Sequence, residues 1–183
     1  METSLVIFVG TAVILAGVLL WYIWTMNRFA RLVVKVKESD SGIEVALTKR
    51  FDTLTKMLDA TKGYARHEAE VLANTVTLRR GMTMSERAEA NRQMDSLALR
   101  INALAEAYPD LKASEVFVQL QRSVTEVEEH LQAARRIYNM NVSSYNQLLV
   151  TWPDSLVGRR HGHTLKEFFE AEERKKEDVR LEF

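Results

Sequence analysis

The chain opens with an unbroken apolar stretch. From Leu5 to Trp24 no residue is charged, and an α-helix of that length spans about 30 Å, the thickness of the hydrocarbon layer of a bilayer. Three aromatic residues close the stretch, at Trp21, Tyr22 and Trp24, and such rings favour the headgroup region. Because Glu2 precedes the stretch and bulky residues end it, a retained anchor is favoured over a cleaved signal peptide. The pattern predicts one transmembrane helix, within residues 1–26.

Basic residues follow this apolar stretch and none precedes it. They are Arg28, Arg31, Lys35 and Lys37. By the positive-inside rule, this asymmetry predicts an outward N-terminus and a cytoplasmic remainder. Two interpretations of residues 27–42 remain open. The segment lies on anionic headgroups, each basic residue contributing about 1 kcal/mol, or it simply continues into a bundle helix.

Beyond a polar stretch at residues 39–42, apolar positions resume at helical intervals. Those between Ile43 and Val76 predict a helix of more than 30 residues. A lone glycine costs a helix only about 1 kcal/mol, so the pattern leaves open whether Gly42 separates this helix from the anchor.

Two further helices follow. Gly81 predicts a helix stop and Ser85 the cap of a second helix, which ends before Pro109 because the residue preceding a proline disfavours the α conformation. The third helix is predicted to end near Pro153.

The third helix carries the clearest periodicity in the chain. Bulky residues recur at every seventh position, at Phe117, Val124, Leu131, Tyr138, Tyr145 and Trp152. A second set interleaves with them, at Leu120, Val127, Ala134, Asn141 and Leu148. Alternating steps of three and four residues predict a coiled-coil seam that packs against partner helices, within the chain or in an oligomer.

Polar residues interrupt this seam. Asn141 is expected to fix helix register or partner choice. Tyr138 and Tyr145 need hydrogen-bond partners if buried, and Asn139 and Asn146 are candidates. We interpret these residues as a structural polar layer, with a ligand pocket as the alternative.

Composition narrows the class further. Gly and Pro are few, at 7 and 2 residues, and 27% of residues are charged, which favours long helices over sheet or disorder. The absence of cysteine excludes disulfides, thiolate metal sites and a cysteine nucleophile. A formal net charge of +0 provides no field to attract nucleic acid, so no nucleic-acid partner is expected.

No pattern of residues predicts catalysis. His161 and His163 are close in sequence, but arginines at 159 and 160 stand beside them and repel a cation. His67 with Glu68 forms half of a zinc-protease motif, but residue 71 is Val, so the second histidine is missing. We therefore predict no catalytic residue, no metal and no cofactor.

Several motifs, taken in order, resemble the LemA family. They are Ile43-Glu44-Val45, Lys49-Arg50-Phe51-Asp52, the segment 62–68, the segment 106–113, the Tyr-Asn pairs at 138–139 and 145–146, Trp152-Pro153, and the segment 167–171. The resemblance implies an N-terminal membrane helix and a cytoplasmic antiparallel bundle, without established chemistry. It links relatives to membrane scaffolding and, for some, to membrane metalloproteases. Glu128 and Arg135 match positions of the family pattern, and an interhelical ion pair is expected there.

Together these features predict an all-α protein in four parts. They are the anchor (1–26), a basic juxtamembrane helix or linker (27–42), an antiparallel bundle of three to four long helices (43–169) and a charged tail (170–183) that docks on a neighbouring subunit or frays. The expected location is the bacterial inner membrane, with a single pass, an outward N-terminus and a cytoplasmic domain.

The expected function is that of a membrane-anchored, non-enzymatic scaffold, which self-associates and organises the membrane or membrane-protein assemblies. The expected partners are membrane lipids, further copies of the chain in a homo-oligomer, and a membrane protease. The alternative is an accessory or adaptor subunit of a membrane protease or transporter.

Overall fold

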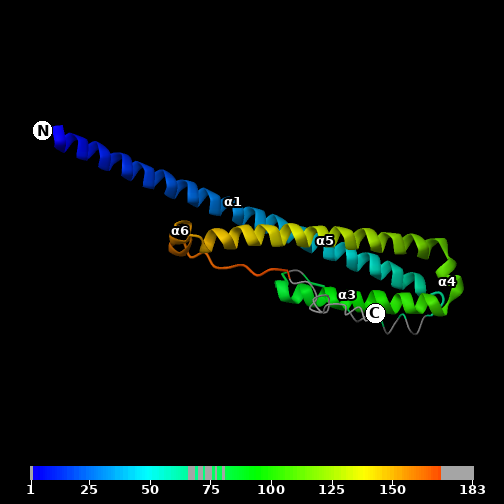
Figure 1. The fold of residues 1–183 in the computed structure, drawn as a ribbon. Coiled ribbons are helices and arrows are strands. Elements are labelled where there is room, and N and C mark those ends of the chain that lie inside the picture. Colours follow the sequence, from blue (N-terminus) through cyan, green and yellow to red (C-terminus); the bar gives the residue numbers. More distant parts are fainter. Residues whose placement is uncertain are drawn as a thin grey trace, which may run out of the picture. The chain divides into compact units, whose positions relative to one another are not determined.

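Helices are the regular secondary structure of the described part of the chain. The computed structural model describes residues 2–65, 69, 72, 76, 78–79 and 81–169, which include no β-strand. The helices are α1 (Glu2–Thr61), α3 (Met84–Ala107), α4 (Pro109–Ala113), α5 (Glu115–Val150) and α6 (Asp154–Arg160) (Figure 1). The all-α prediction is confirmed.

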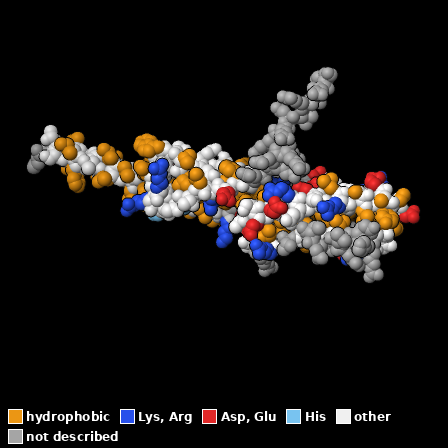
Figure 2. Space-filling view, turned by 90° about the horizontal axis from the view of Figure 1, so that it is seen from below, with side chains coloured by type: hydrophobic (Ala, Val, Ile, Leu, Met, Phe, Trp, Pro, Cys, Tyr) orange, Lys and Arg blue, Asp and Glu red, His pale blue; other side chains and the backbone are white. Residues whose placement is uncertain are grey.

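Helix α1 runs for 60 residues without a break, and Gly42 lies inside it. The anchor and the first bundle helix are therefore one continuous helix, which settles the point that the sequence left open. Among the described helices, α1 alone has a segment long and apolar enough to cross a membrane, and none of that segment is buried by the described residues. In Figure 2 hydrophobic side chains occupy this end of α1, and basic side chains follow directly.

The chain divides into two compact units, which we describe separately. The anchor unit comprises Met1–Ser39 and Met140–Lys166, and the bundle unit comprises Asp40–Asn139 and Glu167–Phe183. Helices α1 and α5 contribute a segment to each unit.

The core of the anchor unit forms around one aromatic side chain. Phe29 of α1 is 1% exposed. Its ring stacks on the imidazole of His163, with centroids 4.6 Å apart, and meets Tyr145 of α5 edge to face at 6.0 Å. Such contacts between rings add about 0.5–1.5 kcal/mol to the burial of apolar area. Phe29 therefore fixes α1 to α5 and to the chain that follows α6.

The core of the bundle unit contains apolar residues from α1, α3, α4 and α5. Those least exposed are Ile43, Leu47, Leu54, Met94, Ile101, Leu111 and Phe117. Full burial of such a side chain stabilises a fold by about 1.5–3 kcal/mol. The repeat of these residues at helical intervals thus explains why α1 packs with α3 and α5 in this unit.

Two predicted helix boundaries are wrong. The helix expected to reach Val76 ends at Thr61, where the Lys62 N–H bonds to the Asp59 carbonyl and the chain turns. The cap of α3 is Thr83, not Ser85: the Thr83 hydroxyl accepts from the Glu86 N–H, and the Glu86 carboxylate accepts from the Thr83 N–H. This reciprocal capping box satisfies two backbone donors at once, which the Ser85 hydroxyl does not do.

The helix stop predicted at Gly81 is also wrong, because α1 ends at Thr61 and the described residues Val76, Leu78 and Arg79 are not helical. Gly81 lies in a turn with a φ of 76°, a conformation that favours glycine. The ends predicted near the two prolines agree with the structure. Helix α3 ends at Ala107, just before Pro109, and α5 ends at Val150, just before Pro153.

We expect Gly158→Ala to destabilise the anchor unit. An added Cβ would lie 2.6 Å from Leu149 Cδ1 and 2.8 Å from Phe29 Cζ, and overpacking of this kind costs about 1–3 kcal/mol. The matched control is Gly42→Ala, whose Cβ meets nothing within 4 Å. It replaces a helix-interior glycine, which destabilises a helix by about 0.5–1 kcal/mol relative to alanine. Thermal unfolding of the detergent-solubilised protein, followed by circular dichroism, should show a lower midpoint for the first variant and an equal or higher one for the second. Equal midpoints for Gly158→Ala and wild type would contradict the packing described.

Candidate membrane-interface site

A buried carboxylate joins α6 to the end of the apolar segment. Asp154, the first residue of α6, is 8% exposed. Its Oδ1 accepts hydrogen bonds from Trp21 Nε1 at 3.2 Å and Thr25 Oγ1 at 2.9 Å, and its Oδ2 lies 3.5 Å from Arg28 Nη1. The three partners are spaced by four and three residues, so they share one face of α1. A buried carboxylate is costly without partners, and these contacts therefore fix α6 beside the C-terminal end of the apolar segment of α1.

Both candidate metal-ligating histidines are engaged by aromatic residues. Tyr22 Oη lies 2.6 Å from His161 Nε2, and Tyr145 Oη lies 3.1 Å from His163 Nδ1. Burial lowers the pKa of His163 below its ordinary value, with smaller contributions from the charges of His161 and Lys166. Neutral imidazole is thus the favoured form of His163 in the folded chain. Within the described ranges no three metal-ligating side chains gather, and His67 and Glu68 lie outside those ranges.

A cavity of about 490 Å³ lies beside the Asp154 contact. Helix α1 contributes Arg28, Arg31, Leu32 and Lys35 to its lining, and α5 contributes Ser144, Gln147 and Leu148, followed by Thr151 and Asp154. Three of the four predicted lipid-facing basic residues therefore meet at one cavity, whereas Lys37 is exposed outside its lining. In the described part of the chain, no carboxylate pairs with Arg31 or Lys35.

The residues of the predicted seam differ in their surroundings. Phe117, Leu131, Tyr138 and Tyr145 are buried and Val124 is half-buried. Asn141 Nδ2 donates to the Lys35 carbonyl and to Ser39 Oγ, both at 3.2 Å. Trp152 is 77% exposed, because α5 ends two residues earlier, so within the chain it does not extend the seam. Its packing in an oligomer stays a prediction.

The asparagines that follow the two seam tyrosines hold an extended segment. In the bundle unit, Asn139 Nδ2 donates to the Phe169 carbonyl at 3.0 Å and Asn139 Oδ1 accepts from the Phe169 N–H at 2.8 Å. In the anchor unit, Asn146 makes the same pair with Lys166, both bonds at 2.9 Å. Each side-chain amide thus satisfies both backbone polar groups of one residue. We call these two contacts the asparagine clamps.

The tyrosines find partners other than the asparagines that the sequence suggested. Tyr138 Oη donates to the Glu167 carbonyl at 3.0 Å, and Tyr145 bonds to His163 as described above. Burial raises the pKa of both phenols, so both remain protonated at neutral pH.

The seven-residue spacing of the Tyr-Asn pairs was the available signal for the clamps. Each pair places an asparagine directly after a seam tyrosine of α5. The backbone that each asparagine binds lies 20 to 30 residues later in the chain, and the spacing does not indicate it.

A buried arginine joins three helices in the bundle unit. The Arg50 side chain of α1 is 4% exposed, and its Nη2 pairs with Asp95 of α3 and with Glu128 of α5, the latter at 2.9 Å. Glu128 thus forms an interhelical ion pair, as expected. Arg135 lies over the ring of Phe169, with Cζ 4.7 Å from the centroid.

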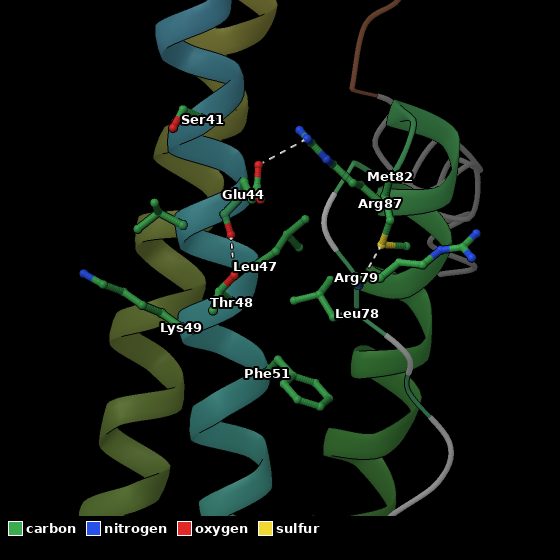
Figure 3. A pocket seen from close by; sticks show the side chains of 11 residues that line it. Ser41, Glu44, Leu47, Thr48, Lys49, Phe51, Leu78, Arg79, Met82 and Arg87 are labelled. Atoms are coloured by element: carbon green, nitrogen blue, oxygen red, sulfur yellow. Dashed lines mark hydrogen bonds and ion pairs between the residues drawn. The ribbon is translucent and has the colours of Figure 1, made fainter.

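A second cavity, of about 600 Å³, lies in the bundle unit. Apolar side chains such as Leu47 and Phe51 line it together with polar ones, and Figure 3 shows Glu44 directed toward Arg87 across it. Arg87 Nη2 lies 3.6 Å from Glu44, and its Nη1 lies 2.7 Å from Asp40. The Arg87 cation is therefore already neutralised by two carboxylates, unlike Arg31 and Lys35 in the other cavity.

These features define the class as a helical-bundle protein whose N-terminal helix is suited to membrane anchoring. The family comparison agrees: the sequence matches the LemA family over residues 39–183. It is 28% identical over 163 residues to Protein LemA of Metamycoplasma hominis, an alignment that covers 86% of this chain and 74% of that relative. The chain belongs to the LemA family, which is not a known enzyme family.

We expect Asn146→Ala to release the backbone of Lys166. The substitution removes both bonds of one clamp, and a lost hydrogen bond of this kind is worth about 1 kcal/mol. With two such bonds lost, amide hydrogen exchange, resolved by residue, should be about thirtyfold faster at Lys166. The Phe169 amide, held by Asn139, should change much less and is the internal control. Unaltered exchange at Lys166 would show that the clamp does not protect this backbone.

Acidification should weaken the anchor unit through His163. Its folded-state pKa is lowered relative to an unfolded value of about 6.5, so the neutral ring stabilises the fold above pH 6.5, and this stabilisation is lost as pH falls through the lower folded value. The thermal midpoint of wild type should fall as the pH drops below 6.5, and His163→Gln should flatten that fall. His130→Gln, at an exposed position, is the control and should retain the wild-type profile. The same pH profile for wild type and His163→Gln would contradict this role.

Proposed function

We propose that this protein is a membrane-anchored, non-enzymatic scaffold that self-associates and thereby organises the membrane or proteins within it. The observation that carries the proposal is the continuity of α1, which supplies both the apolar segment and the first helix of the bundle. One helix thereby contains both the segment that can cross a bilayer and residues of the bundle core. The basic residues after Trp24 support a single pass in a bacterial inner membrane, with the N-terminus outward.

Apolar side chains on the outside of α5 support self-association. Val116, Ile137 and Met140 are 63%, 51% and 62% exposed. Ile137 and Met140 are three residues apart and so share one helix face. Because most of the large seam residues are buried within the chain, a second copy must meet other surfaces, and contiguous exposed apolar side chains are the type of surface that protein interfaces use.

The proposal predicts that Ile137→Lys lowers the oligomeric state. The full-length protein in lipid nanodiscs, measured by light scattering, should exceed the mass of one chain, and the lysine should shift the distribution toward one chain because it places a charge in an apolar contact. The control is Gln132→Lys, which adds the same charge at an exposed position of α5, about 140° around the helix. A wild-type protein that is strictly monomeric would refute self-association.

Cross-linking in native membranes separates this function from that of an adaptor. Cross-links between copies of the chain would support the scaffold. Cross-links to a foreign membrane protease or transporter, with none between copies, would support the accessory-subunit alternative instead. Digestion of the bundle by protease added outside right-side-out vesicles would contradict the orientation.

A further inference from the structure

We propose that the cavity between the α1 and α5 segments of the anchor unit binds the headgroup of an anionic glycerophospholipid. The basic side chains of α1 would hold the phosphate, and the polar side chains opposite would accept hydrogen bonds from headgroup hydroxyls. The inference rests on the membrane anchorage in the proposed function and is independent of self-association.

The position of the cavity along α1 suits a headgroup. At about 1.5 Å per residue, Arg28, Arg31 and Lys35 lie about 6, 10 and 16 Å beyond Trp24 along the helix axis. The headgroup layer is about 5–8 Å deep, so the cavity starts in this layer and extends beyond it. Side chains of a helix lean toward its N-terminus, which in α1 is the direction of the bilayer. Long basic side chains therefore reach back into the phosphate layer.

The charges around the cavity favour an anion. Three cations and one carboxylate line it. Asp154 lies 3.5 Å from Arg28 only, and it also accepts from Trp21 and Thr25. Arg31 Nε donates to the Asn27 carbonyl. Since like charges around one cavity repel each other, a bound phosphate would relieve that repulsion, and guanidinium groups match phosphate oxygens well.

The opposite wall favours a hydroxylated headgroup. Ser144 donates to the Met140 carbonyl, Thr151 to the Gln147 carbonyl, and Gln147 Nε2 to Ser143 Oγ. The hydroxyl hydrogens of Ser144 and Thr151 are thus engaged, and both oxygens keep lone pairs, as does the amide oxygen of Gln147; hydroxyl groups are suitable donors to them. The volume of about 490 Å³ is within the range of small-molecule sites, about 300–1,000 Å³. A phosphoglycerol headgroup combines the anion and the hydroxyls.

A matched pair of lysines distinguishes a site from general attraction to an anionic surface. Lys35 lines the cavity and Lys37 does not, although both are exposed on the same helix. Lys35→Gln and Lys37→Gln remove the same charge at nearly the same distance from the bilayer. A diffuse electrostatic effect predicts that both variants lose the same amount of bound anionic lipid. A specific site predicts that Lys35→Gln loses much more of this lipid than Lys37→Gln.

The test uses the full-length protein in nanodiscs of phosphatidylcholine with a minor fraction of phosphatidylglycerol, followed by native mass spectrometry of the lipid retained. Wild type should retain phosphatidylglycerol over phosphatidylcholine. Lys35→Gln should lower retention about fivefold, the effect of one basic residue near a membrane surface, and Lys37→Gln less than about twofold. Gln147→Leu, which changes no charge, should lower the preference for phosphatidylglycerol over phosphatidic acid.

Two results would overturn the proposal. Equal losses for the two lysine variants would show diffuse attraction, and displacement of all retained lipid by millimolar inorganic phosphate would identify a free-phosphate site. Alkaline carbonate extraction of the same samples separates the underlying claims. Release of wild type would refute the anchorage itself, whereas anchored variants that retain equal lipid would refute the cavity alone.

Discussion

The uninterrupted hydrogen-bond ladder of α1 is the constraint on which the rest of this structure depends. Gly42 is the weak point of that ladder, because it lacks a side chain that could pack and costs about 1 kcal/mol relative to alanine. Contacts on either side hold it helical: Ser39 bonds back to Lys35 and Val36 and accepts from Asn141, and Ile43 is fully buried. The burial of one such side chain outweighs the cost of the glycine. The helix therefore continues through Gly42.

Most helices were predictable because their apolar residues repeat at the helical period. The end of α1 was not predictable, because apolar residues continue at helical spacing beyond Gly63. Periodicity does not show where a helix ends and the chain turns. The cap of α3 illustrates the opposite case. Thr83 and Glu86 stand at the spacing of a capping box, so the signal was present and Ser85 was the wrong choice between two neighbouring candidates. Trp152 shows a third limit: a heptad count does not reveal that the helix has already ended.

The membrane-interface site was predictable only in its basic half. The run of Arg28, Arg31 and Lys35 after an apolar segment indicates phosphate contact by itself, but the cavity depends on residues more than 100 positions later in the chain. The same holds for Asp154, whose bonds to Trp21, Thr25 and Arg28 span 126 to 133 residues. Contacts between residues so far apart in sequence depend on how the helices pack. No local sequence pattern indicates that packing. The heptad pattern likewise predicted correctly that most seam residues are buried. It did not show which helix covers them.

The asparagine clamps have a consequence for how the segment before the tail is recognised. Both amides bind peptide groups, the N–H and C=O that every residue except proline presents, and neither bonds to a side chain of the residue it holds. These hydrogen bonds therefore do not depend on which side chain the bound residue carries. They require only that its backbone is extended. A substitution that changes only the side chain of Lys166 or Phe169 therefore leaves in place the groups that its own clamp binds, whereas a proline at either position would remove the bound N–H.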